Sequence, residues 1–284
     1  MPEGHTLHRL AGELTATFGG AVVRAESPQG RFDAGARQVD GTVLVDADAW
    51  GKQLFVRFEG DRFVHVHLGL YGTFAVYADV DAVPEPVGQV RLRLVRPASG
   101  ERRASYADLR GATRCELVTA AERDAVVERL GPDPLRADAD PDRAWARISR
   151  SAAPIGTLLM DQSVLAGVGN VYRAEVLFRH RIHPLRPGRS LRAPQWRAIW
   201  DDLVVLMAEG VRTGRIDTVR PEHLPEAMGR APRVDDHGGE VYVYRRSDQA
   251  CHVCERPVRT EVLGGRNLFW CARCQPVFRS RAGR

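Results

Sequence analysis

Lysine is almost absent from the sequence. Of the 41 basic residues, Lys52 is the single lysine and the other 40 are arginines. This composition is expected where the genome favours arginine codons and any surface cation suffices. A position that keeps lysine is a candidate for chemistry that arginine cannot supply, because an amine can lose its proton and acts as a compact point charge. The alternative is an ordinary surface lysine.

Long apolar runs are also absent. No stretch reaches the roughly 20 apolar residues that cross a bilayer, and no basic, apolar and small-residue leader opens the chain. We therefore expect a soluble cytoplasmic protein with no membrane partner. A length of 284 residues with 44% apolar content allows two compact domains with ordinary cores.

Acidic residues are few in the C-terminal segment. Residues 242–284 hold nine arginines against three acidic residues, a charge of +6, so the rest of this +5 chain is near −1. Basic charge concentrated in this way indicates a polyanionic partner.

Cysteine is scarce, and four of the five cysteines form two pairs. Cys251 and Cys254 make one Cys-x-x-Cys knuckle, Cys271 and Cys274 make another, and 16 residues separate them. This spacing is typical of a zinc ribbon, in which four thiolates bind one tetrahedral ion and fold a segment too short for its own core. Disulfides are the alternative, which a reducing compartment disfavours. The fifth, Cys115, is most simply a buried or idle thiol.

Periodicity predicts strands in the first half of the chain. Apolar residues at helical spacing predict a helix over residues 3–18, which Gly19-Gly20 ends. Short runs of alternating polarity follow, separated by turns rich in Gly, Pro and Asp, and they predict an antiparallel sandwich or barrel. These runs are residues 43–45, 53–58, 63–67, 73–77, 90–95 and 102–106. The pattern changes at Gly131-Pro132-Asp133-Pro134, where we place a domain boundary.

The second half is predicted to be helical. Asp140 and Pro141 supply an N-cap and a first-turn proline. Short helices over 155–161 and 171–179 flank a glycine-rich turn that ends at Asn170, which either caps the second helix or helps its free N–H groups to bind a phosphate. A longer helix with a buried face follows, its inner residues being Trp196, Ile199, Leu203 and Leu206. Residues 211–240, rich in Arg, Pro and Gly, are expected to form a linker or loop.

The chain begins Met-Pro-Glu-Gly, so removal of Met1 exposes the secondary amine of Pro2. An α-amino group titrates at about pH 8, so much of it is an unprotonated nucleophile under cellular conditions. Such an amine can form an iminium with a sugar aldehyde while Glu3 moves protons. The simpler interpretation is that Pro2 is a stiff chain end and Glu3 a first-turn helix charge.

Four separated motifs together resemble the formamidopyrimidine-DNA glycosylase and endonuclease VIII family. They are the Met-Pro-Glu-Gly start, Lys52 after a glycine, the stretch Leu159-Met-Asp-Gln-Ser-Val-Leu-Ala-Gly-Val-Gly-Asn170, and the terminal cysteine pairs. The resemblance runs over nearly the whole chain in the family's order. It implies an α+β multidomain fold with an N-terminal β-sandwich and flanking helices (1–131), a helix-two-turns-helix DNA-binding domain (132–240) and a zinc ribbon holding one structural Zn²⁺ (241–284).

The resemblance also implies a bifunctional DNA glycosylase and abasic-site lyase of base excision repair. Pro2 would attack C1′ of the damaged nucleotide and expel the base, leaving an iminium, and Glu3 would protonate the opening sugar. Lys52 would contact phosphate and assist the acid-base steps, after which elimination cuts the strand. The partner would be double-stranded DNA with a damaged base or abasic site, bound by a monomer associated with the nucleoid.

The same resemblance gives candidate DNA-binding residues. A nucleotide must leave the stack before chemistry at C1′, and Leu70 and Tyr71 in His67-Leu-Gly-Leu-Tyr71 are the candidate wedge that fills the hole. Alternatively, they are turn residues that pack on the sandwich. Asn170 and Arg266 match positions that grip phosphates, although Arg266 is also one of forty arginines. Arg110 lies in a stretch that matches the Asp-Pro-Arg-Arg-Phe loop of the formamidopyrimidine branch only in part.

Departures from the family pattern concern the substrate range. His5-Thr6 stands where members commonly carry Pro-Glu, and Gly69 stands where endonuclease VIII types carry a larger polar residue. The Leu-Tyr pair favours the endonuclease VIII branch, with oxidised pyrimidines and abasic sites as substrates rather than 8-oxoguanine.

Other functions remain open at this point. They are a non-catalytic damaged-DNA-binding protein, a lyase restricted to abasic sites, and a proline-amine tautomerase acting on small molecules. The first would not need Pro2, Glu3 and Lys52 together, and the tautomerase would need neither a zinc ribbon nor a basic tail.

Overall fold

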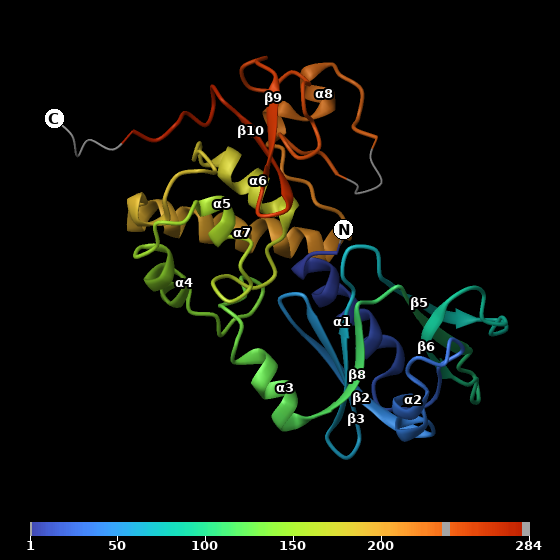
Figure 1. The fold of residues 1–284 in the computed structure, drawn as a ribbon. Helices are drawn as coiled ribbons and strands as arrows, with labels where there is room; N and C mark the ends of the chain where they lie inside the picture. The colour runs from blue at the N-terminus through green and yellow to red at the C-terminus, as the bar shows by residue number, and fades with distance from the viewer. Residues whose placement is uncertain (1, 235–238, 280–284) are drawn as a thin grey trace. The chain divides into compact units, whose positions relative to one another are not determined.

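The chain forms two compact units in this computed structural model, which describes residues 2–234 and 239–279. One unit is Met1–Arg129 and the other is Leu130–Arg284 (Figure 1). Across the described residues, no helix has both the length and the apolar character required to span a bilayer.

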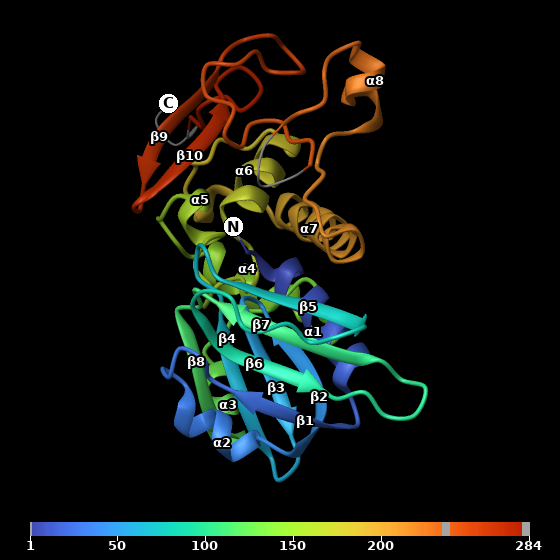
Figure 2. The same ribbon diagram turned by 90° about the vertical axis from the view of Figure 1, so that its right-hand side faces the viewer.

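The N-terminal unit is an antiparallel β-sandwich with flanking helices. Its strands follow the order β5-β7-β6-β1-β2-β3-β4-β8, and β1 belongs to both layers because Ala21–Val23 pair with β2 while Arg24–Glu26 pair with β6. Figure 2 shows β6 and β7 crossing β2, β3 and β4. The elements are α1 (Gly4–Phe18), β1 (Ala21–Glu26), α2 (Asp33–Val39), β2 (Thr42–Trp50), β3 (Gln53–Phe58), β4 (Arg62–His67), β5 (Thr73–Val80), β6 (Val90–Arg96), β7 (Ala104–Arg110), β8 (Arg114–Thr119) and α3 (Ala120–Val127).

Helix α1 lies along β2 in the opposite direction. After the helix ends, the Gly20 N–H donates to Leu44 O at 2.8 Å. Three residues further along β2, the Ala47 N–H donates to Thr15 Oγ1 at 2.8 Å, and Thr15 precedes Gly20 in the chain. The start of α1 therefore points toward the turn in which β2 passes into β3. Its apolar face, including Leu7, Leu14 and Phe18, is buried in the core, so burial of this stripe holds the helix in place.

The C-terminal unit packs helices and a β-hairpin around one core. Its elements are α4 (Pro141–Ile148), α5 (Ile155–Leu158), α6 (Asn170–Arg179), α7 (Ala193–Thr213), α8 (Pro225–Met228), β9 (Val258–Leu263) and β10 (Arg266–Cys271), with short 3-10 turns at Gly188–Ser190 and Pro221–His223. Tyr172 of α6, Trp196 of α7 and Phe269 of β10 belong to the same buried cluster. Because the hairpin and the helices share this core, they stabilise one another.

The predicted sandwich, the cap at Asp140 and the inner face of α7 are confirmed. The Asp140 side chain accepts the Asp142 N–H at 2.9 Å, and Cys115 is buried on β8, where burial raises its thiol pKa to about 12. Asn170 does not cap α6: the N-cap is Gly169, and Asn170 is the first helical residue.

Three other segments differ from the prediction, and in the first two a charge pair explains the difference. The strand predicted over 102–106 is β7, which continues to Arg110, because Asp108 is buried with Arg93 and no longer interrupts the strand. The strand predicted over 43–45 is the nine-residue β2, in which Asp46 pairs with Arg57. The expected loop over 211–240 is partly wrong, because α7 runs to Thr213, α8 follows, and Ile216 and Thr218 are buried.

Candidate functional site

The predicted catalytic residues lie at one end of the N-terminal unit. Glu3 is the N-cap residue of α1, with an extended backbone and no solvent exposure, and Pro2 directly precedes it. Lys52 lies in the turn between β2 and β3, after Gly51, whose φ of 57° a glycine adopts without strain. Because α1 begins at this same end, the fold brings Pro2, Glu3 and Lys52 to one edge of the sandwich.

The unusual pair His5-Thr6 supports the start of α1. The Glu3 N–H donates to Thr6 Oγ1 at 3.4 Å, and His5 Nε2 lies 3.3 Å from the same hydroxyl. Burial, reinforced by the charge of Arg9, lowers the pKa of His5 to about 4, so the ring is neutral near pH 7. The departure from the family pattern thus places a neutral ring and a capping hydroxyl beside Glu3.

The proposed wedge residues stand out from the loop between β4 and β5. Tyr71 is 88% exposed and Leu70 is 38% exposed, whereas Leu68 before them is buried. The Gly72 N–H donates to Leu68 O at 3.0 Å and closes the turn. The alternative in which Tyr71 packs on the sandwich is therefore wrong, and a large aromatic ring is left available to a partner.

Arg110 ends β7 with its guanidinium bound by the protein. Its Nη2 lies 2.9 Å from Asp108 Oδ2 and 3.2 Å from Val87 O. Asp108 in turn binds Arg93 at 2.7 and 2.8 Å, and that pair is almost completely buried. Arg110 is about one third exposed, so reaching a phosphate requires it to leave these partners at least in part.

The two predicted phosphate-binding residues of the C-terminal unit lie on elements that contact each other. Arg266 directly follows the tight Gly264-Gly265 turn between β9 and β10, in which both glycines have positive φ. The Asn170 side chain donates to the carbonyl of the next residue, Asn267, at 3.0 Å. The N-terminus of α6 and the start of β10 are therefore held together.

A buried arginine that the sequence interpretation missed ties this junction together. Arg173 is 1% exposed, donates to Asn267 O at 3.1 Å and to Gly156 O at 3.3 Å, and also contacts Asn170 Oδ1. A charge inside the apolar pattern of α6 was the available indication, because buried cations need such partners.

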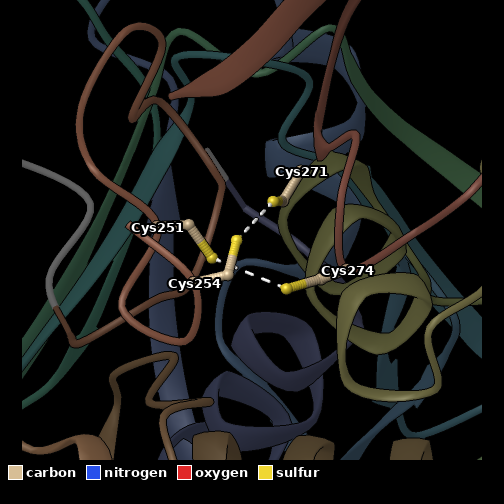
Figure 3. Close-up of side chains that lie close together, drawn as sticks. All are labelled: Cys251, Cys254, Cys271 and Cys274. Atoms are coloured by element: carbon tan, nitrogen blue, oxygen red, sulfur yellow. Dashed lines mark hydrogen bonds between the residues drawn. The ribbon is translucent and has the colours of Figure 1, made fainter. Parts of the chain in front are cut away.

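The four paired cysteines form a site for one zinc ion. Their sulfur atoms all lie within 4.8 Å of one another, with 3.4 Å between Cys254 and Cys271 and 3.9 Å between Cys251 and Cys274 (Figure 3). Tetrahedral zinc with Zn–S bonds of about 2.3 Å requires S···S separations of about 3.8 Å. The residues fit the ion, and its role is to fasten the β9–β10 hairpin.

Glu175 of α6 was also missed by the sequence interpretation. Its carboxylate is fully buried and accepts the consecutive N–H groups of Tyr242, Val243 and Tyr244 at 2.6, 2.8 and 2.9 Å. It also accepts the Thr218 hydroxyl at 2.6 Å. These bonds attach the segment that leads into the zinc ribbon to the helix that carries Asn170.

Three family models match consecutive parts of the chain. Residues 1–115 match the formamidopyrimidine-DNA glycosylase N-terminal domain, residues 130–221 match the H2TH domain of the same glycosylase, and residues 248–277 match a zinc finger found in FPG and IleRS.

Similar proteins extend over nearly the full length. Endonuclease 8 1 of Mycobacterium tuberculosis is 54% identical over 280 residues, which are 97% of this chain and 100% of that protein. Formamidopyrimidine-DNA glycosylase of Thermus thermophilus is 32% identical over 83% of this chain and 84% of its own length. The crystal structure of the MutM (Fpg) protein from Thermus thermophilus superposes with a TM-score of 0.73 at 28% identity, covering 96% of this chain and 98% of that one.

A more distant structure shows that the fold persists at low identity. The Lactococcus lactis Fpg, solved with DNA containing an abasic site, has a TM-score of 0.74 at 20% identity and covers 97% of this chain and 100% of that one. The three matched regions and the relatives that match nearly the full length show the family. The chain belongs to the formamidopyrimidine-DNA glycosylase and endonuclease VIII family.

Proposed function

We propose that this protein is a DNA glycosylase and abasic-site lyase that uses the amine of Pro2 as its nucleophile. The observation that carries the proposal is the placement of Pro2 beside the fully buried Glu3, at the same end of the sandwich as Lys52 and the exposed Tyr71. The likeness to an endonuclease over 97% of this chain and the full length of that protein supports it.

The residues at this end can perform each step of that chemistry. The Pro2 nitrogen forms a bond to C1′ as the bond from C1′ to the base breaks, and the proton that the amine loses passes to the departing base. Glu3 gives a proton to the sugar ring oxygen, which opens the ring and leaves an iminium. Loss of a proton from C2′ then breaks the C3′–O bond, and water releases Pro2. Lys52 holds the phosphate and exchanges protons, for which an amine is suited and a guanidinium is not.

The remaining predicted residues serve binding. Asn170 and Arg266 would hold phosphates near the lesion, Leu70 and Tyr71 would fill the gap left by the flipped nucleotide, and Arg110 would assist. We further propose that double-stranded DNA with an oxidised pyrimidine or an abasic site is the substrate. The solved Lactococcus lactis relative, with its abasic-site DNA, supports such a partner.

We also propose that the chain works as a monomer in the cytoplasm at the nucleoid. Its domains would be a catalytic sandwich (1–131), a helix-two-turns-helix domain (132–240) and a zinc ribbon (241–284). The matched regions 1–115, 130–221 and 248–277 support this division.

Borohydride trapping on a duplex with one abasic site tests the proposal. The processed protein, which begins at Pro2, should give a covalent adduct and a cut strand, because reduction freezes the iminium. Pro2→Gly and a form with one extra N-terminal residue are the comparisons, since the second keeps every side chain and blocks only the secondary amine. Equal binding without an adduct in any form would show a damage-binding protein. Trapping without release of oxidised pyrimidines would show a lyase restricted to abasic sites.

A further inference from the structure

The wedge loop rests on the short connection between β7 and β8. Residues 68–72 join β4 to β5, and residues 111–113 join β7 to β8; β4 pairs with β8 and β5 pairs with β7. Both connections therefore cross between the two sheets side by side. Ala112 is buried, and Thr113 faces the wedge loop.

Thr113 binds the residue from which the wedge loop departs. Its backbone N–H donates to His67 O at 2.9 Å, and its hydroxyl donates to the same carbonyl at 3.0 Å. The hydroxyl also lies 2.9 Å from His67 Nδ1, so its single hydrogen is shared between this nitrogen and the carbonyl oxygen. The Gly69 N–H donates to the same Nδ1 at 3.2 Å. Because Nδ1 accepts this bond, the neutral ring carries its hydrogen on Nε2. Burial and the charges of Lys52 and Arg114 lower the pKa of His67, which keeps the ring neutral near pH 7.

The methyl group of Thr113 occupies the space that a side chain at position 69 would need. A Cβ on Gly69 would lie 2.4 Å from Thr113 Cγ2, and the φ of Gly69 is +71°. A larger residue at position 69 is therefore excluded twice, by contact and by backbone conformation. Gly69, which departs from the endonuclease VIII pattern, therefore fits the space that Thr113 leaves.

We propose that Thr113 is the positioning residue of the DNA wedge, and that Gly69 and Thr113 form a matched pair that restricts insertion to Leu70 and Tyr71. The inference rests on the proposed function, in which these two side chains replace the flipped nucleotide. The hydroxyl of Thr113 fixes where the loop leaves β4, and the methyl group of Thr113 leaves no room for a side chain at position 69. Position 69 then presents no side chain that could hydrogen-bond to the opposite base, so we expect excision to depend less on that base than it would with a polar residue there.

A set of variants separates the hydroxyl from the methyl. Thr113→Val keeps the shape and removes the hydroxyl, whereas Thr113→Ser keeps the hydroxyl and removes the methyl. Gly69→Ala introduces the clash, and Gly69→Ala with Thr113→Ser relieves the contact while the φ strain remains. Thr42→Val is the matched control, because Thr42 Oγ1 donates to Val39 O at 2.7 Å at the opposite end of the sandwich.

Two readouts report on the wedge rather than on folding. The first is the ratio of borohydride trapping on duplex to trapping on single-stranded abasic DNA, since a single strand leaves no stacked hole to fill. The second is the emission of 2-aminopurine opposite a tetrahydrofuran site, which changes when a ring stacks beside it. We expect Thr113→Val to lower the ratio about fivefold, as loss of one hydrogen bond would, while Thr113→Ser and Thr42→Val keep the wild-type ratio.

The coupling between the two positions decides the outcome. Gly69→Ala should lower the ratio more than Thr113→Val does, and adding Thr113→Ser should restore part of it. Equal impairment of Gly69→Ala and the double variant, or a wild-type ratio and emission in Thr113→Val, would overturn the inference. Failure of the proposed function gives a different result, because the wild-type protein would then trap neither duplex nor single-stranded DNA.

Discussion

The buried carboxylate of Glu175 gives the sharpest test of what holds the zinc ribbon to the helices. Each of its oxygens accepts two hydrogen bonds: Oε2 from the Tyr242 N–H and the Thr218 hydroxyl, and Oε1 from the Val243 and Tyr244 N–H groups. The perturbation is Glu175→Gln, which keeps the size of the side chain. It replaces one acceptor oxygen with an NH₂ group that donates.

The magnitude follows from the number of donors left without an acceptor. Whichever oxygen is replaced, two hydrogen bonds to a charged acceptor are lost, each worth roughly 1.5–3 kcal/mol. The neutral amide is cheaper to bury than a carboxylate, which offsets part of this loss. The nearby Arg179 and Arg246 also lose a favourable charge. We expect the free energy of unfolding of the C-terminal unit to fall by about 3 kcal/mol, a large share of the 5–15 kcal/mol typical of a domain.

Urea unfolding measures this change through tryptophan fluorescence, with Trp270 on β10 as a reporter of the ribbon. Zinc release, followed with a colorimetric chelator, should begin at a lower urea concentration in the variant. Glu209→Gln is the matched control: Glu209 is exposed on α7 and pairs with Arg212, so its loss should cost at most about 0.5 kcal/mol. A decrease below about 1 kcal/mol for Glu175→Gln, or unchanged zinc release, would refute the reasoning.

Three further predictions follow from buried charge and from zinc. Burial lowers the pKa of His5 and His65 to about 4; the unfolded chain therefore binds more protons between about pH 6.5 and pH 4, and stability should fall as pH falls through that window, by up to about 3 kcal/mol per ring. Denaturation midpoints across this range check it, and His65→Phe should flatten the slope. Asp108→Ala leaves Arg93 buried without its carboxylate and should cost about 3–5 kcal/mol, most of which adding Arg93→Leu should restore in the same assay. Cys254→Ser should lower the zinc content, measured by atomic absorption, from one ion per chain.

Much of the fold could be predicted from periodicity and spacing. The helix at the start, the antiparallel sandwich and the cysteine pairs depend on patterns that lie within a few residues of one another. The extent of β7 could not be predicted, because Asp108 interrupts its apolar pattern until Arg93, 15 residues earlier, pairs with it. The burial of Thr218 was missed for a similar reason, since its partners are Glu175 of α6 and the carbonyl of Glu240.

In the candidate site too, some residues could be predicted from the sequence and others could not. Pro2, Glu3 and Lys52 were predicted by residue type and motif, and the fold explains why they lie at the same end of the sandwich, because α1 lies along β2 in the opposite direction. Asn170 was assigned two alternative roles, and the structure excludes the cap. Its neighbour Arg173 was not predicted, because two of its partners are backbone carbonyls from distant segments, Gly156 and Asn267, which the sequence does not place beside α6.

The residues whose roles the sequence did not predict share a physical property, which explains why apolar periodicity does not identify them. Glu175, Asp108 and Thr113 are polar groups whose bonding partners are supplied by distant segments, and each fixes an element that carries a predicted functional residue. A buried polar group is tolerated only when its partners are in place, so such a group specifies one arrangement of the elements around it. An apolar contact tolerates small shifts, whereas these bonds do not. Accurate placement of Asn170, Arg110 and Leu70 therefore depends on residues that by sequence alone look like interruptions of the pattern.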